Sequence, residues 1–218
     1  MQNTEQKGDK RIVILSTAYF APLQYFAELL SGDADIFIER HENYSRQSYR
    51  NRCTIYAANG LLDLSVPVAK RDKSNKLITE VKISYDTPWQ KQHFKAIESA
   101  YRRSPFYEYY IDDLMPFFKC RHTYLYDFNM QILSTVCSLM KVSFCVQETE
   151  TYSKYEDKKI TDLRNVIHPA ASKQNKYFAP HYSQVFAEKW GFKPNLSILD
   201  LLLNTGMEAK FLLNSKLN

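Results

Sequence analysis

Glycine is scarce in this chain, with five among 218 residues. None of the five falls in a G-x-G-x-x-G or G-x-x-x-x-G-K-S/T pattern, so the two common phosphate-binding loops are absent. The G-x-S-x-G turn of serine hydrolases and the H-E-x-x-H zinc motif are missing as well. The sequence therefore carries none of the best-known nucleotide-binding and hydrolase signatures.

The sequence also lacks a pattern that would hold a metal ion. Its five histidines are dispersed, and none has metal-ligand spacing with another. The four cysteines contain no C-x-x-C pair, and Cys137 and Cys145 lie in apolar patterns typical of buried thiols. We expect four free thiols, and neither a metal nor another cofactor.

Long apolar runs are absent too. No stretch approaches the roughly eighteen residues of a membrane-spanning helix, and the polar N-terminus lacks the apolar segment of a signal peptide. We therefore expect a cytoplasmic protein. The net charge of +5 is too mild to indicate binding of nucleic acid, but it would help to attract a phosphorylated small molecule.

What the sequence does contain is a clear α/β pattern. Residues 11–16 and 34–39 are short apolar runs with the β-branched side chains of buried strands. Pro22 opens a helix between them and Gly32 follows its end, so the segment predicts a right-handed parallel βαβ unit. A third strand of the core sheet is expected at residues 142–147.

A β-hairpin is predicted around Asn59-Gly60, because this dipeptide supplies the positive φ angles of a type I′ turn. The run "LITEVKISY" (77–85) would extend the hairpin into a meander. Helices are expected from Thr87 to about Arg103 and over the amphipathic stretch 124–142. A last helix should begin at Ser197, with Asp200 at capping-box spacing, and end at Gly206.

The predicted fold class is thus α/β, with a mixed sheet, an N-terminal βαβ unit, a hairpin or meander extension and several packed helices. Residues 11–218 should form one domain after a disordered polar tail, residues 1–10. Residues 148–180 are irregular and polar, which favours a long loop with one short helix at residues 161–166.

Two segments carry side chains suited to ligand binding. Tyr19 and Phe20 follow the first strand, where open parallel sheets bind ligands, and their rings would either stack on a ligand or cover the core. Arg50, Asn51 and Arg52 are either exposed polar residues or an anion-binding cluster, since guanidinium groups suit phosphate.

A third segment, the helix from Trp89, carries two candidate catalytic residues. His93 is the default general base because an imidazole titrates near neutral pH, although a histidine on such a stripe is often a satisfied, semi-buried residue. Glu98 lies five positions later, roughly 140° around the helix, so the two cannot form a close pair within it. Each would need a partner from elsewhere.

These segments carry a resemblance to a known family. The matching stretches include "AYFAPLQYFAELL", "ENYSRQSYRNRCTIYAANGLLDLSVPV", "WQKQHFKAIESAYRRSPFYEYY" and "YSQVFAEKWGFKPNLSILDLLLNTG". Along nearly its whole length the chain resembles the WbqC-like protein family. One position departs from the pattern: Ala21 precedes Pro22 where family members tend to carry two prolines.

The resemblance implies a role in surface-polysaccharide assembly, because the family is named after a member encoded among O-antigen biosynthesis genes. The expected function is a transferase that acts on a nucleotide-linked sugar, with acyl or aminoacyl transfer to an amino sugar as one reaction. Arg50 and Arg52 would bind the diphosphate, and Tyr19 or Phe20 would stack on the base. Asn51 would either orient the cluster or bind a sugar hydroxyl. The alternative is a non-catalytic binding or scaffold protein of a polysaccharide assembly complex.

Overall fold

The computed structural model describes residues 10–69, 76–143, 146–155, 157, 159–170, 177 and 179–214. A parallel sheet is formed by β1 (Arg11–Ser16), β2 (Ala34–Glu39), β5 (Val146–Glu148) and β6 (Ile160–Asp162), in the order β5-β2-β1-β6. Val13 pairs with Ile36 and Ile14 with Phe37, which confirms the predicted βαβ unit. The third predicted strand also lies in this sheet, at residues 146–148.

The hairpin is present but does not extend the sheet. Strands β3 (Arg52–Ala57) and β4 (Gly60–Ser65) form a separate two-stranded antiparallel sheet. The predicted α/β class, with its βαβ unit, hairpin and packed helices, is confirmed, but the parallel and antiparallel strands lie in two sheets rather than in one mixed sheet. The backbone of β3 forms hydrogen bonds with other parts of the chain. The Thr54 carbonyl oxygen accepts from the Ser197 N–H, and the Tyr56 N–H donates to the Tyr101 hydroxyl. These bonds tie the hairpin to the helices.

Local details of the hairpin differ from the expectation for the same segment. The positive φ falls on Gly60 alone, at 106°, so the turn is not type I′. The predicted third strand of the meander is a 3-10 helix, η2 (Ile78–Glu80), followed by single bridges such as Val68 to Ile83. The helix predicted at residues 161–166 was wrong as well, because Ile160–Asp162 pairs with β1.

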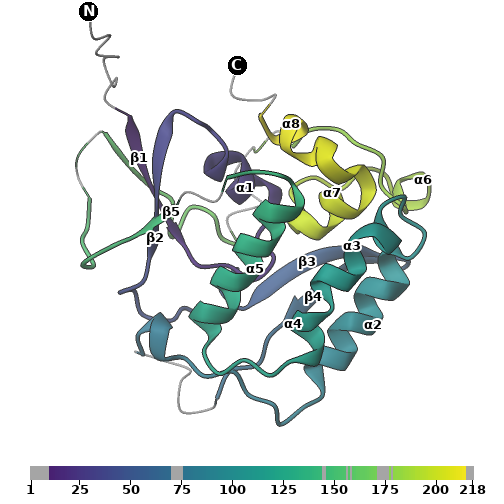
Figure 1. The fold of residues 1–218 in the computed structure, drawn as a ribbon, viewed down its shortest axis with the longest axis horizontal. Helices are drawn as coiled ribbons and strands as arrows, with labels where there is room; N and C mark the ends of the chain where they lie inside the picture. The colour runs from purple at the N-terminus through teal and green to yellow at the C-terminus, as the bar shows by residue number, and fades with distance from the viewer. Residues whose placement is uncertain are drawn as a thin grey trace, which may run out of the picture.

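Helices cover the rest of the fold, as Figure 1 shows, with the parallel sheet on one side of the molecule and α2, α3 and α4 on the other. Their bounds are α1 (Leu23–Leu29), α2 (Trp89–Tyr101), α3 (Tyr107–Leu114), α4 (Pro116–Lys119), α5 (Leu125–Leu139), α6 (Ala187–Trp190), α7 (Ile198–Thr205), η4 (Gly206–Glu208) and α8 (Ala209–Asn214). The apolar stripe of α5 is buried, as its pattern predicted. Within the described ranges, no helix has the length and apolar character needed to cross a membrane.

The described cysteines are free thiols: Cys53 and Cys137 are buried and Cys120 is exposed. Burial raises the pKa of Cys137 to about 12, so its thiol stays protonated at neutral pH. Cys145, and all but the last residue of the predicted N-terminal tail, lie outside the described residues. Among those that are described, no group of three or more His, Cys, Asp or Glu side chains could hold a metal ion.

A buried carboxyl group holds the start of α7 against the segment before α6. Ser197 caps α7 by accepting from the Leu199 N–H, but no capping box forms, because Asp200 points into the core. There its Oδ2 accepts from the Tyr182 hydroxyl at 2.6 Å and from Gln184 Nε2 at 2.9 Å. Burial raises the pKa of Asp200 from 3.8 to about 6.

This raised pKa predicts a pH dependence of stability. The folded chain binds a proton at Asp200 more tightly than the unfolded chain, so the stabilisation is complete below pH 4 and is lost as the pH rises through about 6. Asp200→Asn removes the titration. The difference in unfolding free energy between wild type and variant should therefore fall by on the order of 3 kcal/mol from pH 3.5 to 7. Urea denaturation at several pH values measures it, and parallel stability curves would contradict the assignment.

Candidate functional site

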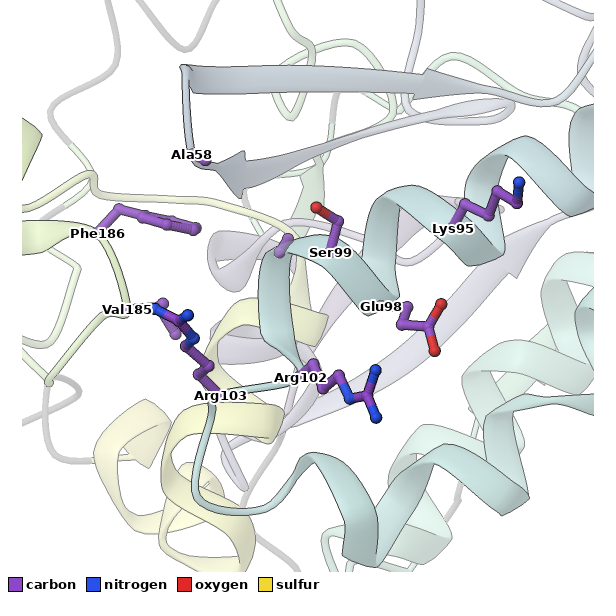
Figure 2. A pocket seen from close by; sticks show the side chains of 9 residues that line it. Ala58, Lys95, Glu98, Ser99, Arg102, Arg103, Val185 and Phe186 are labelled. Atoms are coloured by element: carbon purple, nitrogen blue, oxygen red, sulfur yellow. The ribbon is translucent and has the colours of Figure 1, made fainter.

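A groove of about 600 Å³ runs along α2 (Figure 2). Its floor is the polar face of the helix, where residues three, four and seven positions apart share one side. The opposite wall comes from the hairpin turn at Ala58 and from the segment before α6. The lining residues are Ala58, Lys95, Glu98, Ser99, Ala100, Arg102, Arg103, Val185 and Phe186.

The far wall of the groove is held in place by buried polar contacts. The Tyr56 hydroxyl lies 3.1 Å from the carbonyl oxygen of Phe186 and 2.8 Å from that of Gly191. One residue before the wall, Gln184 donates to the buried carboxylate of Asp200 and to the Lys193 carbonyl oxygen. Because Tyr56 and Asp200 are themselves buried in the core, the wall has a defined position relative to α2.

The groove carries a positive charge. Lys95, Arg102 and Arg103 face a single carboxylate, Glu98, and three cations minus one anion leave a net charge of +2. None of the three cations forms an ion pair with another residue that the structure describes. In Figure 2, Arg103 extends toward Val185, while Glu98 and Arg102 extend from the same side of α2. An anionic ligand would find guanidinium and ammonium groups here that no described carboxylate pairs with.

His93 lies on the buried face of α2, 5% exposed, and thus away from the polar face that carries Glu98. Its Nδ1 is 2.9 Å from the Tyr19 hydroxyl, and its ring packs 5.1 Å from that of Trp89. Burial lowers the pKa of His93 to about 4, so the imidazole is neutral at pH 7. The structure thus brings Tyr19 and His93 together and leaves Glu98 in the groove.

Tyr19 and Phe20 both belong to the hydrophobic core. Tyr19 is fully buried and Phe20 is 1% exposed, and their rings contact those of Phe117, Phe118 and Phe128. Of the two alternatives for this loop, the geometry matches the one in which the rings cover the core. Stacking of either ring on a ligand stays a prediction.

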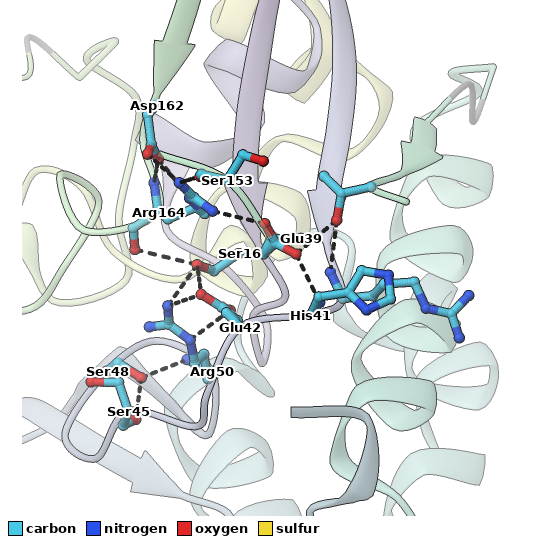
Figure 3. A network of polar contacts seen from close by, with 12 residues as sticks. Ser16, Glu39, His41, Glu42, Ser45, Ser48, Arg50, Ser153, Asp162 and Arg164 are labelled. Carbon is cyan, nitrogen blue, oxygen red and sulfur yellow. Dashed lines mark hydrogen bonds and ion pairs between the residues drawn. The ribbon is translucent and has the colours of Figure 1, made fainter. Parts of the chain in front are cut away.

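Arg50 is buried in a polar network at the carboxyl ends of the parallel strands (Figure 3). Its Nε donates to Glu42 at 2.8 Å, and its Nη2 donates to Glu42 and to the Ser16 hydroxyl. Burial raises the pKa of Glu42 even though Arg50 partly offsets it. The guanidinium group is therefore paired within the protein.

Asn51 and Arg52, the two residues after Arg50, contact other parts of the chain. Asn51 donates from Nδ2 to the Val66 carbonyl oxygen at 2.8 Å. Arg52 lies at the start of the hairpin, where its Nε is 3.2 Å from the Ser65 hydroxyl and its Nη1 is 3.6 Å from Asp63. The two arginines do not converge on one cavity, so the diphosphate-binding role expected for Arg50, Asn51 and Arg52 stays a prediction, and each has structural contacts.

Sequence reasoning missed Arg164, the second buried arginine of this network. Its guanidinium donates to Glu39 at 2.7 Å and to Asp162 at 2.9 Å (Figure 3). The short β-capable run at residues 160–162 ends two positions before Arg164, but three residues are too few to identify a strand. A cavity borders both arginines at the carboxyl ends of β1 and β6, where open parallel sheets bind ligands. Its volume of about 10 Å³ holds only about one water molecule.

Comparisons with known proteins place the chain among relatives. Residues 17–180 match the family model described as WbqC-like protein family. A protein of Mycobacterium tuberculosis, described as uncharacterized protein Rv1507c, is 27% identical over 224 residues, which cover 92% of this chain and 96% of the relative. No solved structure matches the chain significantly.

The contacts of Arg50 and Arg52 predict losses of stability of very different size when each is substituted. Arg50→Ala leaves Glu42 buried without its partner, so the free energy of unfolding should fall by about 3–5 kcal/mol. Arg52→Ala, the control, removes a half-exposed pair and should cost less than about 1 kcal/mol. Urea denaturation followed by circular dichroism measures both. Equal, small losses would indicate that Arg50 is not structural.

Proposed function

Because this chain belongs to the WbqC-like protein family, we propose that it is a transferase of surface-polysaccharide biosynthesis that binds a nucleotide-linked sugar in the groove along α2. One observation carries the binding part of the proposal. The groove offers one carboxylate and three cations that have no ion-pair partner among the described residues, in a volume of about 600 Å³, a size within the usual range for small-molecule sites.

The charge of the groove suits a diphosphate. In a nucleotide sugar, the diphosphate between the nucleoside and the sugar carries about two negative charges, which would balance the net charge of +2 in the groove. Arg102 and Arg103 have the planar donor geometry that binds phosphate oxygens in pairs, and Lys95 adds a point charge about two helical turns away. The aromatic ring of Phe186 forms part of the far wall and is available to a base or sugar.

Glu98 supplies the chemistry in this proposal. In acyl or aminoacyl transfer to an amino sugar, the amine nitrogen forms a bond to the acyl carbon of the donor while the bond between that carbon and its carrier group breaks. A base takes the proton from the attacking amine, and the departing carrier group accepts a proton. Glu98 is the carboxylate among the groove residues, whereas His93 is buried and bonded to Tyr19. The proposal therefore assigns the base to Glu98 and leaves His93 with the role of holding Tyr19.

The second candidate function is a non-catalytic binding or scaffold protein of a polysaccharide assembly complex. It is favoured by large apolar side chains that are open to solvent. Tyr109 is 71% exposed, Phe211 65% and Leu61 58%, and such side chains are common at protein interfaces. The two candidates differ in whether the bound sugar is chemically changed.

Binding of a nucleotide sugar should raise the stability of the chain. At a hundred times its dissociation constant the ligand adds about 2.7 kcal/mol, which a thermal-shift screen of nucleotide sugars detects. Lys95→Gln and Arg103→Gln should each weaken binding by about tenfold to a hundredfold, because each removes a charge-assisted contact. Lys141→Gln, an exposed lysine outside the groove, is the control. If all three variants bind like wild type, the groove is not the site.

Glu98→Gln separates an enzyme from a binding protein. The substitution removes a negative charge from a groove that binds an anion, so affinity should be kept or increased. Turnover should fall by about 10² to 10⁴, the usual contribution of a general base. Mass spectrometry of a nucleotide amino sugar after incubation with acyl and aminoacyl donors reports turnover. Bound but unchanged sugar with wild-type protein across the donor panel would favour the scaffold reading.

A further inference from the structure

The groove along α2 has an aromatic end. Phe186 is the one aromatic side chain among the described residues that line it, and Figure 2 shows Phe186 and Ala58 at one end of the lining and Lys95 at the other. Arg103 extends toward Val185, the residue before Phe186, and thus points to the aromatic end. The two ends of the groove therefore offer different chemistry to a ligand.

Trp190 extends this aromatic end beyond the lining. It is the last residue of α6, and its N–H donates to the Phe186 carbonyl oxygen at 3.1 Å, one helical turn earlier. Residues four positions apart on a helix are neighbours on its surface. The indole Nε1 donates to the carbonyl oxygen of Ala58, another lining residue, at 3.1 Å. Trp190 therefore lies at the rim of the groove.

The indole of Trp190 is both exposed and held in position. The residue is 45% exposed, and its single polar side-chain atom is bonded to Ala58, so the ring offers a flat carbon surface to a ligand. Tyr56 holds the backbone on either side, because its hydroxyl lies within 3.1 Å of the carbonyl oxygens of Phe186 and Gly191. A ring fixed in this way loses little conformational freedom when a ligand stacks on it.

A cation accompanies the ring. Lys189 Nζ lies 4.9 Å from the centroid of the Trp190 ring and 3.4 Å from the Ala58 carbonyl oxygen. Arg103 adds a second positive charge from within the groove. The aromatic end therefore favours a ligand that carries negative charge close to a planar ring.

Of the parts of a nucleotide sugar, the nucleobase suits this end best. A nucleobase is a planar π system that stacks on aromatic rings, and the phosphates of the nucleotide follow it. The hydroxyl and amino groups of a sugar need polar partners instead. Lys95 and Glu98 supply such partners away from Phe186, as Figure 2 shows.

We propose that Trp190 and Phe186 hold the nucleobase of the nucleotide-linked sugar and so fix the direction in which the ligand lies; this inference rests on the function proposed for the groove. The nucleobase lies at the α6 end, the diphosphate at the groove arginines, and the sugar toward Lys95 and Glu98. In this direction the sugar, and not the nucleobase, comes next to the carboxylate.

Ligands that contain only part of a nucleotide sugar test the proposal. The probes are the nucleotide sugar with the largest shift in the thermal-shift screen, the nucleoside diphosphate and the sugar 1-phosphate that correspond to its two parts, and inorganic pyrophosphate. Trp190→Ala should weaken binding of the nucleotide sugar and of the nucleoside diphosphate by at least about fivefold, the low end for stacking of a nucleobase on an aromatic ring. Its affinity for pyrophosphate and for the sugar 1-phosphate should stay unchanged, because neither contains a nucleobase. Isothermal titration calorimetry measures all four.

Two further variants separate stacking from a change in the wall. Trp190→Phe lacks the bond to Ala58 but keeps a ring, so it should restore most of the binding that Trp190→Ala loses. Phe211→Ala is the matched control, because Phe211 is 65% exposed, lies 5.0 Å from the ammonium group of the preceding lysine and is outside the groove lining. It should bind all four ligands like wild type. Circular dichroism confirms that each variant is folded.

Fluorescence of the wild type gives a measurement that needs no variant. The chain has two tryptophans, and Trp89 is 2% exposed, so quenching by acrylamide reports mainly on Trp190. The nucleoside diphosphate should protect the indole from acrylamide, whereas pyrophosphate should not. Equal quenching with and without the nucleoside diphosphate would contradict the stacking.

The outcomes separate this inference from the function proposed for the groove. If Arg103→Gln weakens binding of the nucleotide sugar but Trp190→Ala does not, the groove binds the ligand without Trp190, and the inference alone is overturned. If Trp190→Ala weakens binding of the sugar 1-phosphate rather than of the nucleoside diphosphate, the ligand lies in the opposite direction, which overturns the inference as well. If no nucleotide sugar binds to the wild type, both proposals are overturned.

Discussion

The buried Arg50, paired with Glu42, connects the parallel sheet with the hairpin and α5. Arg50 precedes the hairpin by two residues, and its guanidinium reaches Ser16 at the end of β1. Its carbonyl oxygen accepts from Asn129 of α5, so the same residue also positions that helix. A buried charge is tolerated only with a complete set of partners, and this requirement fixes where the hairpin and α5 sit against the sheet. The hairpin in turn carries Ala58, one edge of the groove.

The local sequence pattern correctly predicted those elements whose structure depends on residues close together in the chain. β1 and β2 lie at the predicted residues, and the stripe of α5 is buried as its spacing required. β6 was missed because three residues carry too little periodicity, and its identity depends on pairing with β1, which is distant in sequence. The hairpin was recognised, but its attachment to Ser197 and Tyr101 rather than to the sheet is a long-range effect that no local pattern contains.

In the candidate site, too, local sequence pattern predicted some features, while others depend on contacts between residues distant in the chain. Helix geometry alone separated His93 from Glu98, and the structure places them on different faces of α2. The burial of Arg50 could not be predicted from an arginine beside an asparagine, because Glu42 and Ser16 become its partners only in the folded chain. Arg102 and Arg103 were overlooked since basic residues at a helix end also occur simply to offset its dipole. The walls at Ala58 and at Val185 and Phe186, which are distant in sequence, turn that face of α2 into a groove.

Asp200 also connects the groove with proton binding. Gln184, which precedes the groove wall, donates to this carboxyl group, whose pKa of about 6 lies near neutral pH. Proton binding at Asp200 and occupancy of the groove are therefore linked equilibria whenever a ligand alters the position of that wall. Linkage is reciprocal, so such a ligand would take up or release protons on binding. The number of protons equals the change in the logarithm of the ligand's binding constant per pH unit. A buried aspartate that never touches the ligand would then contribute to the heat of binding measured in different buffers.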